Sequence, residues 1–532
     1  MFLYIFVYIL IVFYIIKVSK RTLHMLQQNL YNENNRYLNW ISDNKRVTVI
    51  NYSIIGIVIS LMIMVCKKNF IVNFLLLLLM IIYLISYFKE QRISLKNQNK
   101  KPLVYTPRIK RLIITHILIY LIIILLSIFK TNYINIYLFI LTILSSLSFY
   151  TTFIALIINY PVEKAIYKHY EKMAKSKLAG MKNLKVIGIT GSYGKTSSKN
   201  ILNDILSIKY NTLSTPKSLN TFNGLMITIN NKLSAFDEIF IAEMGAYVKG
   251  EINGLCDLVN PKYGIITSIG TAHLKTFGSE EAIQEGKMEL IEHLPIDGVG
   301  VLNKDDPKQV SYKIKNKCKI LWVGIDADDV DVRASNIKID GIKTTFDVTF
   351  RGDKKKYKFE TKLLGKHNIY NILSSLALGY LFGIEIKDLQ TSVKRVRMVE
   401  HRMEIKRLGN FYQIDDAYNS NPVGAKSALN VLASVDGYKI VVTPGMVELG
   451  SKEEELNKEF GKQISEVADF VILVGSKKTK PIYDGLIEKG YDNKKIKIIN
   501  DVRESYSFIN GLNKNKEIYA LYENDLPDTY NE

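Results

Sequence analysis

Residues 185–197 read KVIGITGSYGKTS, and this stretch decides the fold of the soluble part of the chain. Its apolar first part, Lys185 to Ile189, predicts a buried strand, and the segment from about Lys195 to Ser207 predicts a helix. Between them, Gly191 and Gly194 let the backbone turn so that its N–H groups and the helix N-terminus face an anion. The pattern therefore predicts a strand, an anion-binding loop and a helix in direct succession.

The loop has the chemistry of a cradle for a nucleotide triphosphate. Lys195 adds a positive charge beside the phosphates, and Thr196 offers a hydroxyl group to Mg²⁺. The ordinary phosphate-loop motif would need glycine at position 189, where this chain has Ile189, so the general motif is not met. A structural turn without a ligand is the alternative interpretation.

Three more polar residues follow the next predicted strands, Glu238 to Ala242 and Tyr263 to Ser268. Glu243 ends the first of these strands, His273 lies just past the second, and Lys287 lies on the helix that follows. A carboxylate and an imidazole at neighbouring strand ends are placed to hold metal at the carboxyl edge of a parallel sheet. Taken singly, each has a structural alternative: a helix cap, a loop residue and a solvated lysine.

Outward from this core, apolar runs alternate with amphipathic segments, which predicts α/β units with parallel strands. Residues 330–364 change to short alternating runs and predict antiparallel hairpins beside the main sheet. A second α/β series begins near His401. Its predicted strands are Lys439 to Val442, Phe470 to Val474, Ile496 to Ile499 and Ile518 to Leu521.

Five apolar stretches precede residue 161 and predict a membrane region. They are Phe2–Ile16, Ile50–Cys66, Phe70–Phe88, Leu112–Phe129 and Tyr133–Ile158. Four are close to or above the length of about 17 to 25 residues that crosses the hydrocarbon core. The first is short. Because it has no basic segment before it and no small-residue cleavage site after it, we expect an uncleaved anchor rather than a signal peptide.

Lysine and arginine are unevenly distributed along the chain. The net charge is +20, and residues 1–160 hold 17 Lys and Arg against three acids, which leaves only +6 for the remaining 372 residues. This excess lies between the apolar stretches, so it indicates membrane topology rather than nucleic-acid binding. The positive-inside rule predicts that segments 17–46 and 89–111, and everything after about residue 160, are cytoplasmic.

Histidine and cysteine add two smaller indications. His116 falls within the fourth apolar stretch, where an ionisable side chain is a functional candidate; a structural role for a single neutral histidine is the alternative. The three cysteines, Cys66, Cys256 and Cys318, are too few and too scattered for a disulfide framework or a CxxC metal site. A reducing compartment is the simple interpretation.

Several further motifs occur in a definite order along the soluble part of the chain. They are ITGSYGKTSS, SLNTFNG, AEMGA, TAHL followed by FGS and a lysine, VLNKDD, GKHNIYNILSSLALG, EHRMEI, and DDAYNSNP with GMVELG. In these motifs, over roughly Lys185 to Gly450, the chain resembles the Mur ligases, ATP-dependent amide-bond-forming enzymes of peptidoglycan precursor synthesis. It is most similar to the members that add D-alanyl-D-alanine. The resemblance implies a central P-loop ATPase domain and a Rossmann-like C-terminal domain that closes over it.

The resemblance also implies roles for individual residues. Those that would bind the nucleotide are Gly191, Ser192, Gly194, Lys195, Thr196, Ser197, Asn303, Asn368, Asn371 and Arg402. Those that would hold two Mg²⁺ ions are Thr196, Glu243, His273 and Lys287, the last as a carbamate formed with CO₂. Those that would take part in catalysis are Lys195, His273, Lys287, Arg402 and Asp416, of which Arg402 and Asp416 bring the C-terminal domain onto the nucleotide.

We therefore expect a five-span membrane region at 1–160, a central ATP-binding domain at 161–400 and a C-terminal domain at 401–532. The implied reaction uses ATP to convert a carboxylate to an acyl phosphate, which an amine such as D-alanyl-D-alanine then attacks. The expected partners are ATP, a peptide-bearing cell-wall precursor, either soluble or lipid-linked, and membrane lipid, with no nucleic acid. The expected location is the cell membrane, with the catalytic domains cytoplasmic.

The chain departs from the family pattern at both ends. A membrane region stands where the family has a domain that binds uridine diphosphate, and the last residues are ALYENDLPDTYNE rather than a KGSR-type segment. One alternative is therefore a membrane-bound ligase for another carboxylate, like the poly-γ-glutamate synthetases. Another is a non-catalytic membrane scaffold that binds nucleotide, against which the intact Lys195, Glu243, His273 and Lys287 argue.

Overall fold

The computed structural model describes residues 2–48, 53–96, 102–217, 219–340, 343–353, 355–399, 401–417, 422–447, 449, 452–512 and 514–524. The chain divides into two compact units, Met1–His169 and Tyr170–Glu532. The first is built from helices and is called the helical unit below. The second contains both β-sheets and is called the α/β unit.

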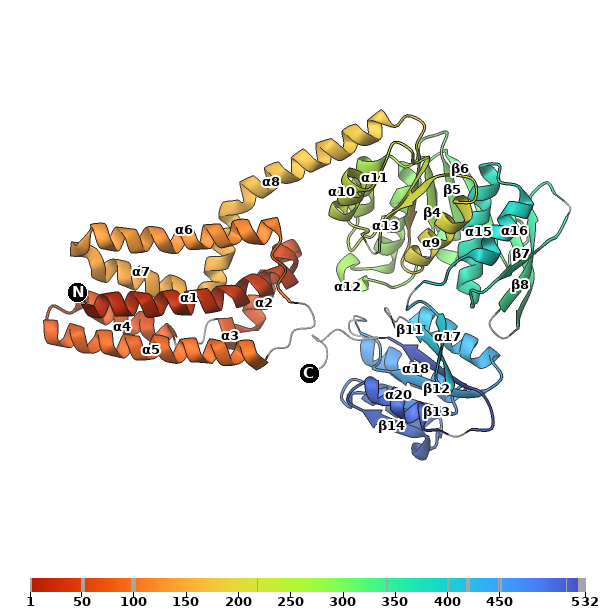
Figure 1. The fold of residues 1–532 in the computed structure, drawn as a ribbon. Coiled ribbons are helices and arrows are strands. Elements are labelled where there is room, and N and C mark those ends of the chain that lie inside the picture. Colours follow the sequence, from red (N-terminus) through yellow and green to blue (C-terminus); the bar gives the residue numbers. More distant parts are fainter. Residues whose placement is uncertain are drawn as a thin grey trace. The chain divides into compact units, whose positions relative to one another are not determined.

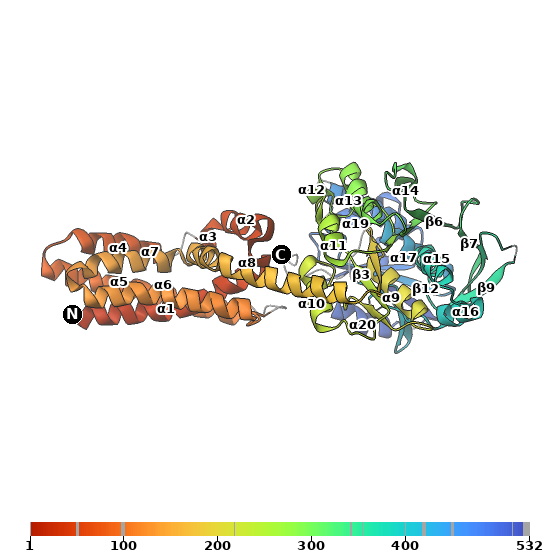
Figure 2. The ribbon, with the colours of Figure 1, turned by 90° about the horizontal axis from the view of Figure 1, so that it is seen from above.

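The helical unit consists of long apolar helices packed against one another. They are α1 (Phe2–Gln28), α4 (Ser53–Val65), α5 (Asn69–Lys96), α6 (Pro107–Phe129) and α7 (Ile134–Ser146), with the shorter α2 (Arg36–Asp43) and α3 (Lys45–Thr48). Helix α8 (Ser148–Gly180) begins in this unit and ends in the α/β unit. Helix α1 packs along α5, and α4 along α7, as two views show (Figures 1 and 2).

Among the described residues, α1, α5 and α6 are long and apolar enough to cross a membrane. This differs from the five predicted spans at two places. The second prediction corresponds to α4, whose 13 described residues extend only about 20 Å, short of a hydrocarbon core about 30 Å thick. The fifth is bent at Leu147, where α7 and α8 meet at 92°; the two helices together are still long and apolar enough for one broken span.

At the break between α7 and α8, hydroxyl side chains bond to backbone carbonyl groups. Ser148 Oγ donates to Ser145 O, and Thr151 Oγ1 donates to Leu144 O at 2.8 Å. These carbonyl groups would accept backbone N–H groups in a continuous helix, so the hydroxyls compete with the helical ladder. Hydropathy measures only how apolar the residues are and contains no information on these hydrogen bonds. The sequence therefore predicted one continuous span over this stretch.

The main sheet of the α/β unit has, among the described residues, nine strands in the order β2-β3-β1-β4-β5-β6-β7-β8-β9. They are β1 (Lys185–Thr190), β2 (Thr212–Ser214), β3 (Ile239–Glu243), β4 (Tyr263–Ile266), β5 (Val299–Asn303), β6 (Lys319–Gly324), β7 (Val332–Asp340), β8 (Lys343–Phe350) and β9 (Tyr357–Thr361). Strands β2 to β7 are parallel, whereas β7, β8 and β9 are antiparallel. The predicted hairpins are present, but they extend the main sheet through β6 and β7.

Helices cover both faces of this sheet (Figure 1). One face packs against α9 (Lys195–Leu206), α15 (Lys366–Leu381) and α16 (Ile386–Arg395), and the other against α10 (Phe222–Asn231), α11 (Glu251–Val259) and α13 (Glu280–His293). Two short helices, α12 (Leu274–Phe277) and α14 (Pro307–Ser311), lie in the connections. Because both faces are covered, the strands are buried apolar runs, as the sequence predicts for parallel β-structure.

The second sheet has the described strand order β10-β11-β15-β12-β13-β14. Its strands are β10 (Glu404–Leu408), β11 (Phe411–Asp416), β12 (Tyr438–Thr443), β13 (Phe470–Val474), β14 (Ile496–Ile499) and β15 (Ile518–Glu523). Helices α17 (Pro422–Ser434), α18 (Glu453–Ser465) and α19 (Lys480–Glu488) pack on one face, and α20 (Arg503–Asn510) on the other. The α/β fold class and the four predicted strands, β12 to β15, are confirmed.

Candidate functional site

The loop between β1 and α9 is shaped by its two glycines. Gly191 has φ +152°, and a Cβ atom there would lie 2.1 Å from Thr267 Oγ1. Gly194 has φ +78° and is the N-cap of α9. Ser192 N donates to Ser268 O at 2.7 Å, which ties the loop to the residues that follow β4. Both glycines therefore occupy positions that other residues cannot fill without strain.

Helix α9 begins with three predicted site residues, Lys195, Thr196 and Ser197. The Nζ atom of Lys195 donates to Gly191 O at 2.8 Å and to Ser192 O at 3.2 Å, so the side chain lies back over its own loop. Desolvation is the main cause that lowers the pKa of Lys195, to about 8. The first-turn N–H groups of a helix lack partners within that helix, and they can bind phosphate oxygens at this position.

Glu243, at the end of β3, is buried beside this helix. Strand register places it next to Ile189 in β1, so the strand end and the loop share one edge of the sheet. Its Oε1 atom accepts hydrogen bonds from Thr196 Oγ1 at 3.0 Å and from Asn220 Nδ2 at 3.1 Å. Two predicted metal ligands, Thr196 and Glu243, are therefore in direct contact.

Lys199 is a site residue that the motif does not indicate. Its side chain is buried, and Nζ lies 2.9 Å from Glu243 Oε2 and donates to Lys217 O at 2.5 Å. Only its position one turn after Lys195, on the same helix, suggested proximity. The Nζ atom of Lys199 and the carboxylate of Glu243 thus form an ion pair that is buried inside the protein.

The segment after Glu243 connects the other two predicted metal ligands. Lys287 on α13 donates from Nζ to Ala246 O at 3.1 Å, and the ring of His273 lies against the ring of Tyr247, with centroids 4.4 Å apart. His273 follows β4 with φ +61°. Among the described residues no three His, Cys, Asp or Glu side chains form a metal cluster; the predicted set contains only two of these types.

Lys287 is almost completely buried, at 1% exposure. Its Nζ atom lies 5.2 Å from the centroid of the Phe277 ring. Desolvation lowers the pKa of Lys287 to about 7, and the nearby charge of Lys195 lowers it further in the same direction. A substantial part of this amine is therefore neutral near pH 7, which is the form that reacts with CO₂.

The three predicted nucleotide-contacting asparagines differ in their surroundings. Asn371 on α15 lies against the loop, since its Oδ1 atom would be 3.6 Å from a Cβ at Gly194. Asn368 donates from Nδ2 to Leu364 O at 2.8 Å, and Asn303 Oδ1 accepts from Asp305 N at 3.0 Å. All three are buried. The structure brings Asn371 to the loop and occupies the other two with local hydrogen bonds.

Arg402 and Asp416 lie where the second sheet begins. The Oδ1 atom of Asp416 accepts from Met403 N at 3.2 Å. Desolvation raises the pKa of Asp416 to about 6, and the charge of Arg402 opposes that rise. The charge of Arg402 also contributes to the lowered pKa of Lys195, which indicates that this segment lies close to the loop. Parts of DDAYNSNP and GMVELG, residues 418–421, 448 and 450, lie outside the described residues.

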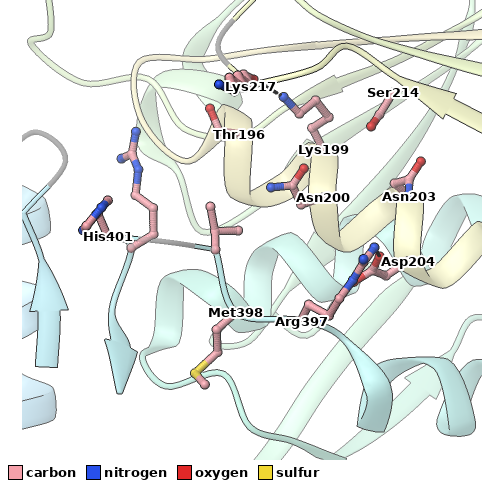
Figure 3. A pocket seen from close by; sticks show the side chains of 12 residues that line it. Thr196, Lys199, Asn200, Asn203, Asp204, Ser214, Lys217, Arg397, Met398 and His401 are labelled. Atoms are coloured by element: carbon pink, nitrogen blue, oxygen red, sulfur yellow. Dashed lines mark hydrogen bonds and ion pairs between the residues drawn. The ribbon is translucent and has the colours of Figure 1, made fainter. Parts of the chain in front are cut away.

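A cavity of about 580 Å³ adjoins α9 (Figure 3). Residues of α9, of β2 and its following loop, and of segment 397–402 line it: Thr196, Lys199, Asn200, Asn203, Asp204, Ser214, Lys217, Arg397, Met398, Val399, His401 and Arg402. The carboxylate of Asp204 is paired with Arg397, whose N and Nε atoms lie 3.0 and 3.2 Å from Oδ2. Basic side chains thus outnumber acidic ones in this lining, which suits an anionic ligand. Thr196 and Arg402 face the same space.

Comparison with known proteins places these two sheets in a family. The family model described as "Mur ligase middle domain" matches residues 189–379, and the family model described as "Mur ligase, glutamate ligase domain" matches residues 401–519. A UDP-N-acetylmuramoyl-tripeptide–D-alanyl-D-alanine ligase of Bacillus subtilis is 34% identical over 303 residues, which are 56% of this chain and 63% of that protein. The Escherichia coli enzyme of the same name is 30% identical over 294 residues, 55% of this chain and 64% of its own. The chain thus spans just under two thirds of these relatives.

Solved structures agree on the fold. MurF of Acinetobacter baumannii superposes with a TM-score of 0.61 at 24% identity, covering 68% of this chain and 78% of that one. MurF of Thermotoga maritima, solved in complex with ADP, has a TM-score of 0.59 at 25% identity. The match covers 67% of this chain and 80% of that one.

Proposed function

Because the chain belongs to the Mur ligase family, we propose that it is an ATP-dependent ligase that joins a carboxylate to an amine through an acyl phosphate. The observation that carries the proposal is the contact of Thr196 in α9 with Glu243 at the end of β3, beside the glycine-shaped loop. A loop that served only as a turn would not need a buried carboxylate, paired with a buried lysine, next to its hydroxyl group.

In this proposal the phosphates of ATP bind at the loop and at the start of α9, where Lys195 supplies positive charge. An oxygen of the substrate carboxylate attacks the γ-phosphorus, the bond from that phosphorus to the bridging oxygen breaks, and ADP leaves. The amine nitrogen then attacks the acyl carbon, phosphate departs and the nitrogen loses a proton. Lys195 stabilises the negative charge that builds up on the transferred phosphoryl group.

The residues present fit a magnesium ion. Thr196 Oγ1 and Glu243 Oε1 are hard oxygen donors in contact, which is the donor type that Mg²⁺ prefers. Bound Mg²⁺ supplies further neutralisation of phosphate charge. Lys199, paired with the other carboxylate oxygen, holds Glu243 in place for this role. We further propose that Lys287 carries a carbamate and that His273 and this carbamate serve a second Mg²⁺.

For the substrates, we propose a peptide-bearing UDP-N-acetylmuramoyl precursor and D-alanyl-D-alanine, because the relatives that match carry that activity in their names. Purified protein incubated with ATP, UDP-N-acetylmuramoyl-tripeptide and either D-alanyl-D-alanine or glutamate, followed by mass spectrometry, tests this choice. A product carrying D-alanyl-D-alanine is expected, and it should be missing with Lys195→Ala protein. A product that carries only glutamate, in one or more copies, would instead identify a polyglutamate ligase.

We also propose that the helical unit holds the enzyme in the membrane with its catalytic part in the cytoplasm. The apolar helices α1, α5 and α6 support this, as does the concentration of basic residues in segments 17–46 and 89–111. In a Cys66→Ser background, a cysteine placed at residue 100 should react with a membrane-impermeant thiol reagent only after the cells are opened. Reaction in intact cells would contradict the proposed orientation.

A further inference from the structure

Two cavities lie between α1 and α6 in the helical unit. The first, of about 450 Å³, is lined by α1 from Val12 to Leu23 and by α6 from Ile113 to Ile124. The second, of about 510 Å³, is lined by α1 from Tyr4 to Phe13, by the end of α6 and by the turn after it. Val12 and Ile124 line both cavities, so the two form one groove, called the α1–α6 groove here. Along α6 it extends about 22 Å, from Ile113 to Ile128.

Most of the α1–α6 groove is lined by aliphatic side chains. Its middle and far part are formed by residues such as Ile9, Val12, Ile124 and Ile128. An extended apolar groove of this length, in helices that lie in a membrane, suits a hydrocarbon chain rather than water.

Both ends of the groove carry polar groups: hydroxyl groups line the end near Tyr4 and Tyr8, where the Tyr8 hydroxyl has no partner among the described residues, and the end near Ser19 has in addition an imidazole and a lysine. His116 is only 3% exposed, and neither ring nitrogen has a hydrogen-bond partner among the described residues. The buried Oγ atom of Ser19 likewise has none among them. The neighbouring Tyr120 meets the His116 ring edge-on and donates its hydroxyl to Leu144 O, so it does not serve either group. Buried polar atoms without partners are rare, because they cost free energy that a ligand can restore.

The polar groups at this end share one chemical property, which is that each can donate. Lys20, exposed at the same cavity, has three N–H donors and no acceptor; the Ser19 hydroxyl and one imidazole nitrogen of His116 can also donate. A phosphate group offers only acceptor oxygens and negative charge, which complements this set. A choline head group would place a second cation near Lys20.

We propose that the α1–α6 groove binds a phosphate-headed lipid, with a hydrocarbon chain along the aliphatic part and the phosphate at the end where Ser19, Lys20 and His116 lie. The inference rests on the proposed membrane location of the helical unit and does not depend on the ligase reaction. His116, which the sequence singled out within an apolar stretch, thereby has a role as a ligand-binding residue.

The test uses the full-length protein in phosphatidylcholine nanodiscs. Two photoactivatable probes carry the same diazirine-labelled acyl chain, one with a phosphate head group (phosphatidic acid) and one with phosphocholine. After irradiation, peptide mass spectrometry locates the adducts. The phosphate-headed probe should label the aliphatic part of the groove, residues 5–16 and 117–128, about fivefold more than the choline probe, as expected for one basic residue near a lipid phosphate.

Equal labelling by the two probes, or labelling spread evenly over the outward faces of α5 and α6, would overturn the inference. This comparison needs only the wild-type protein, so it does not depend on the folding of any variant. A protein that does not enter nanodiscs would overturn the membrane placement itself and, with it, the lipid site, and that outcome is distinct from uniform labelling.

Two variants refine the assignment. The double variant Lys20→Met/His116→Leu should keep the groove labelling and lose the preference for phosphate. Val12→Trp, at the junction of the two cavities, should lose groove labelling with both probes. The matched control is Ile81→Trp, at an outward position of α5, which should label like wild type. An unchanged head-group preference in the double variant would contradict the role of these side chains.

Discussion

The helical unit and the α/β unit differ in the ionisable side chains that they bury completely. Between its helices the helical unit buries neutral hydroxyl pairs: Ser60 with Thr142 at 2.6 Å, Tyr83 with Ser145 at 2.6 Å and Thr152 with Thr22 at 2.7 Å. The α/β unit buries ionisable groups, in the Lys199–Glu243 ion pair and in the amine of Lys287.

The difference follows from the surroundings for which each unit is suited. Hydroxyl pairs can join helices in a hydrocarbon medium at little electrostatic cost, whereas a buried ion pair pays a desolvation penalty that only a specific role or network offsets. The outward faces agree, because exposed large apolar side chains are frequent along α1, α5 and α6. The comparison places the chemistry in the α/β unit.

The largest effect is expected for Lys195→Ala. If the lysine stabilises charge on the transferred phosphoryl group, ATP turnover should fall on the order of 10³-fold, with the unfolding transition nearly unchanged. Phosphate release and thermal unfolding measure the two quantities. The exposed Lys232→Ala variant on the same unit is the control. Wild-type turnover together with lowered stability would instead show that Lys195 stabilises the structure of its loop and does not act on the phosphoryl group.

The buried ion pair gives the next largest effect. Lys199→Met leaves the Glu243 carboxylate buried without its cation, so the free energy of unfolding should fall by about 3 kcal/mol. Adding Glu243→Gln removes the uncompensated charge and should restore part of that loss. Urea midpoints of the detergent-solubilised protein measure both variants. A double variant less stable than Lys199→Met alone would show that the unpaired charge of Glu243 does not cause the loss of stability in Lys199→Met.

Lys287 is expected to give a smaller, pH-dependent effect. Burial lowers the pKa of Lys287 to about 7, below its usual value of 10.5, so the neutral amine is favoured as the pH rises through 7. Below that pKa the neutral fraction falls about fivefold between pH 7 and pH 6. The ¹³C NMR signal of the lysine carbamate, formed with ¹³C-labelled bicarbonate, should therefore also fall between pH 7 and pH 6. Lys287→Ala should lose the signal and the activity, and acetate should restore part of the activity. A wild-type level of activity in Lys287→Ala would exclude Lys287 from the mechanism.

The smallest effect tests the helical side of the comparison. Tyr83→Phe removes only the hydrogen bond to Ser145 and should lower stability by about 0.6 kcal/mol, the average for such bonds between membrane helices. Thermal unfolding in detergent measures the change against Tyr87→Phe, whose hydroxyl makes no hydrogen bond with the described residues. If Tyr83→Phe lost as much stability as Lys199→Met, the hydroxyl pairs of the helical unit and the buried ion pair of the α/β unit would not differ in their energetic contribution.

Much of the α/β unit was predictable because its signals are local. The apolar run of β1, the glycines and the polar start of α9 follow one another within a few residues, and β12 to β15 are short apolar runs of the same kind. The β10–β11 hairpin was not predicted, because β10 is a partly exposed edge strand of mainly polar residues. Its pairing with β11 is decided by the sheet rather than by its own composition.

For the candidate site, the sequence indicates residues but not the contacts between them. The motifs indicated Thr196 and Glu243, but their contact depends on β3 lying next to β1, which no local pattern encodes. The Lys199–Glu243 pair depends in addition on the face that α9 turns to the sheet. In the helical unit, hydropathy predicted apolar helices, but it carries no information on the break at Leu147, where hydroxyl groups bond to backbone carbonyls.

The most direct test of the proposed ligase reaction follows an oxygen atom. UDP-N-acetylmuramoyl-tripeptide labelled with ¹⁸O in its terminal carboxylate is incubated with the protein, ATP and D-alanyl-D-alanine, and the released phosphate is analysed by mass spectrometry. An acyl phosphate transfers one carboxylate oxygen to phosphate, so we predict one ¹⁸O per phosphate released in step with amide formation. Phosphate released without the label would contradict the acyl-phosphate ligase.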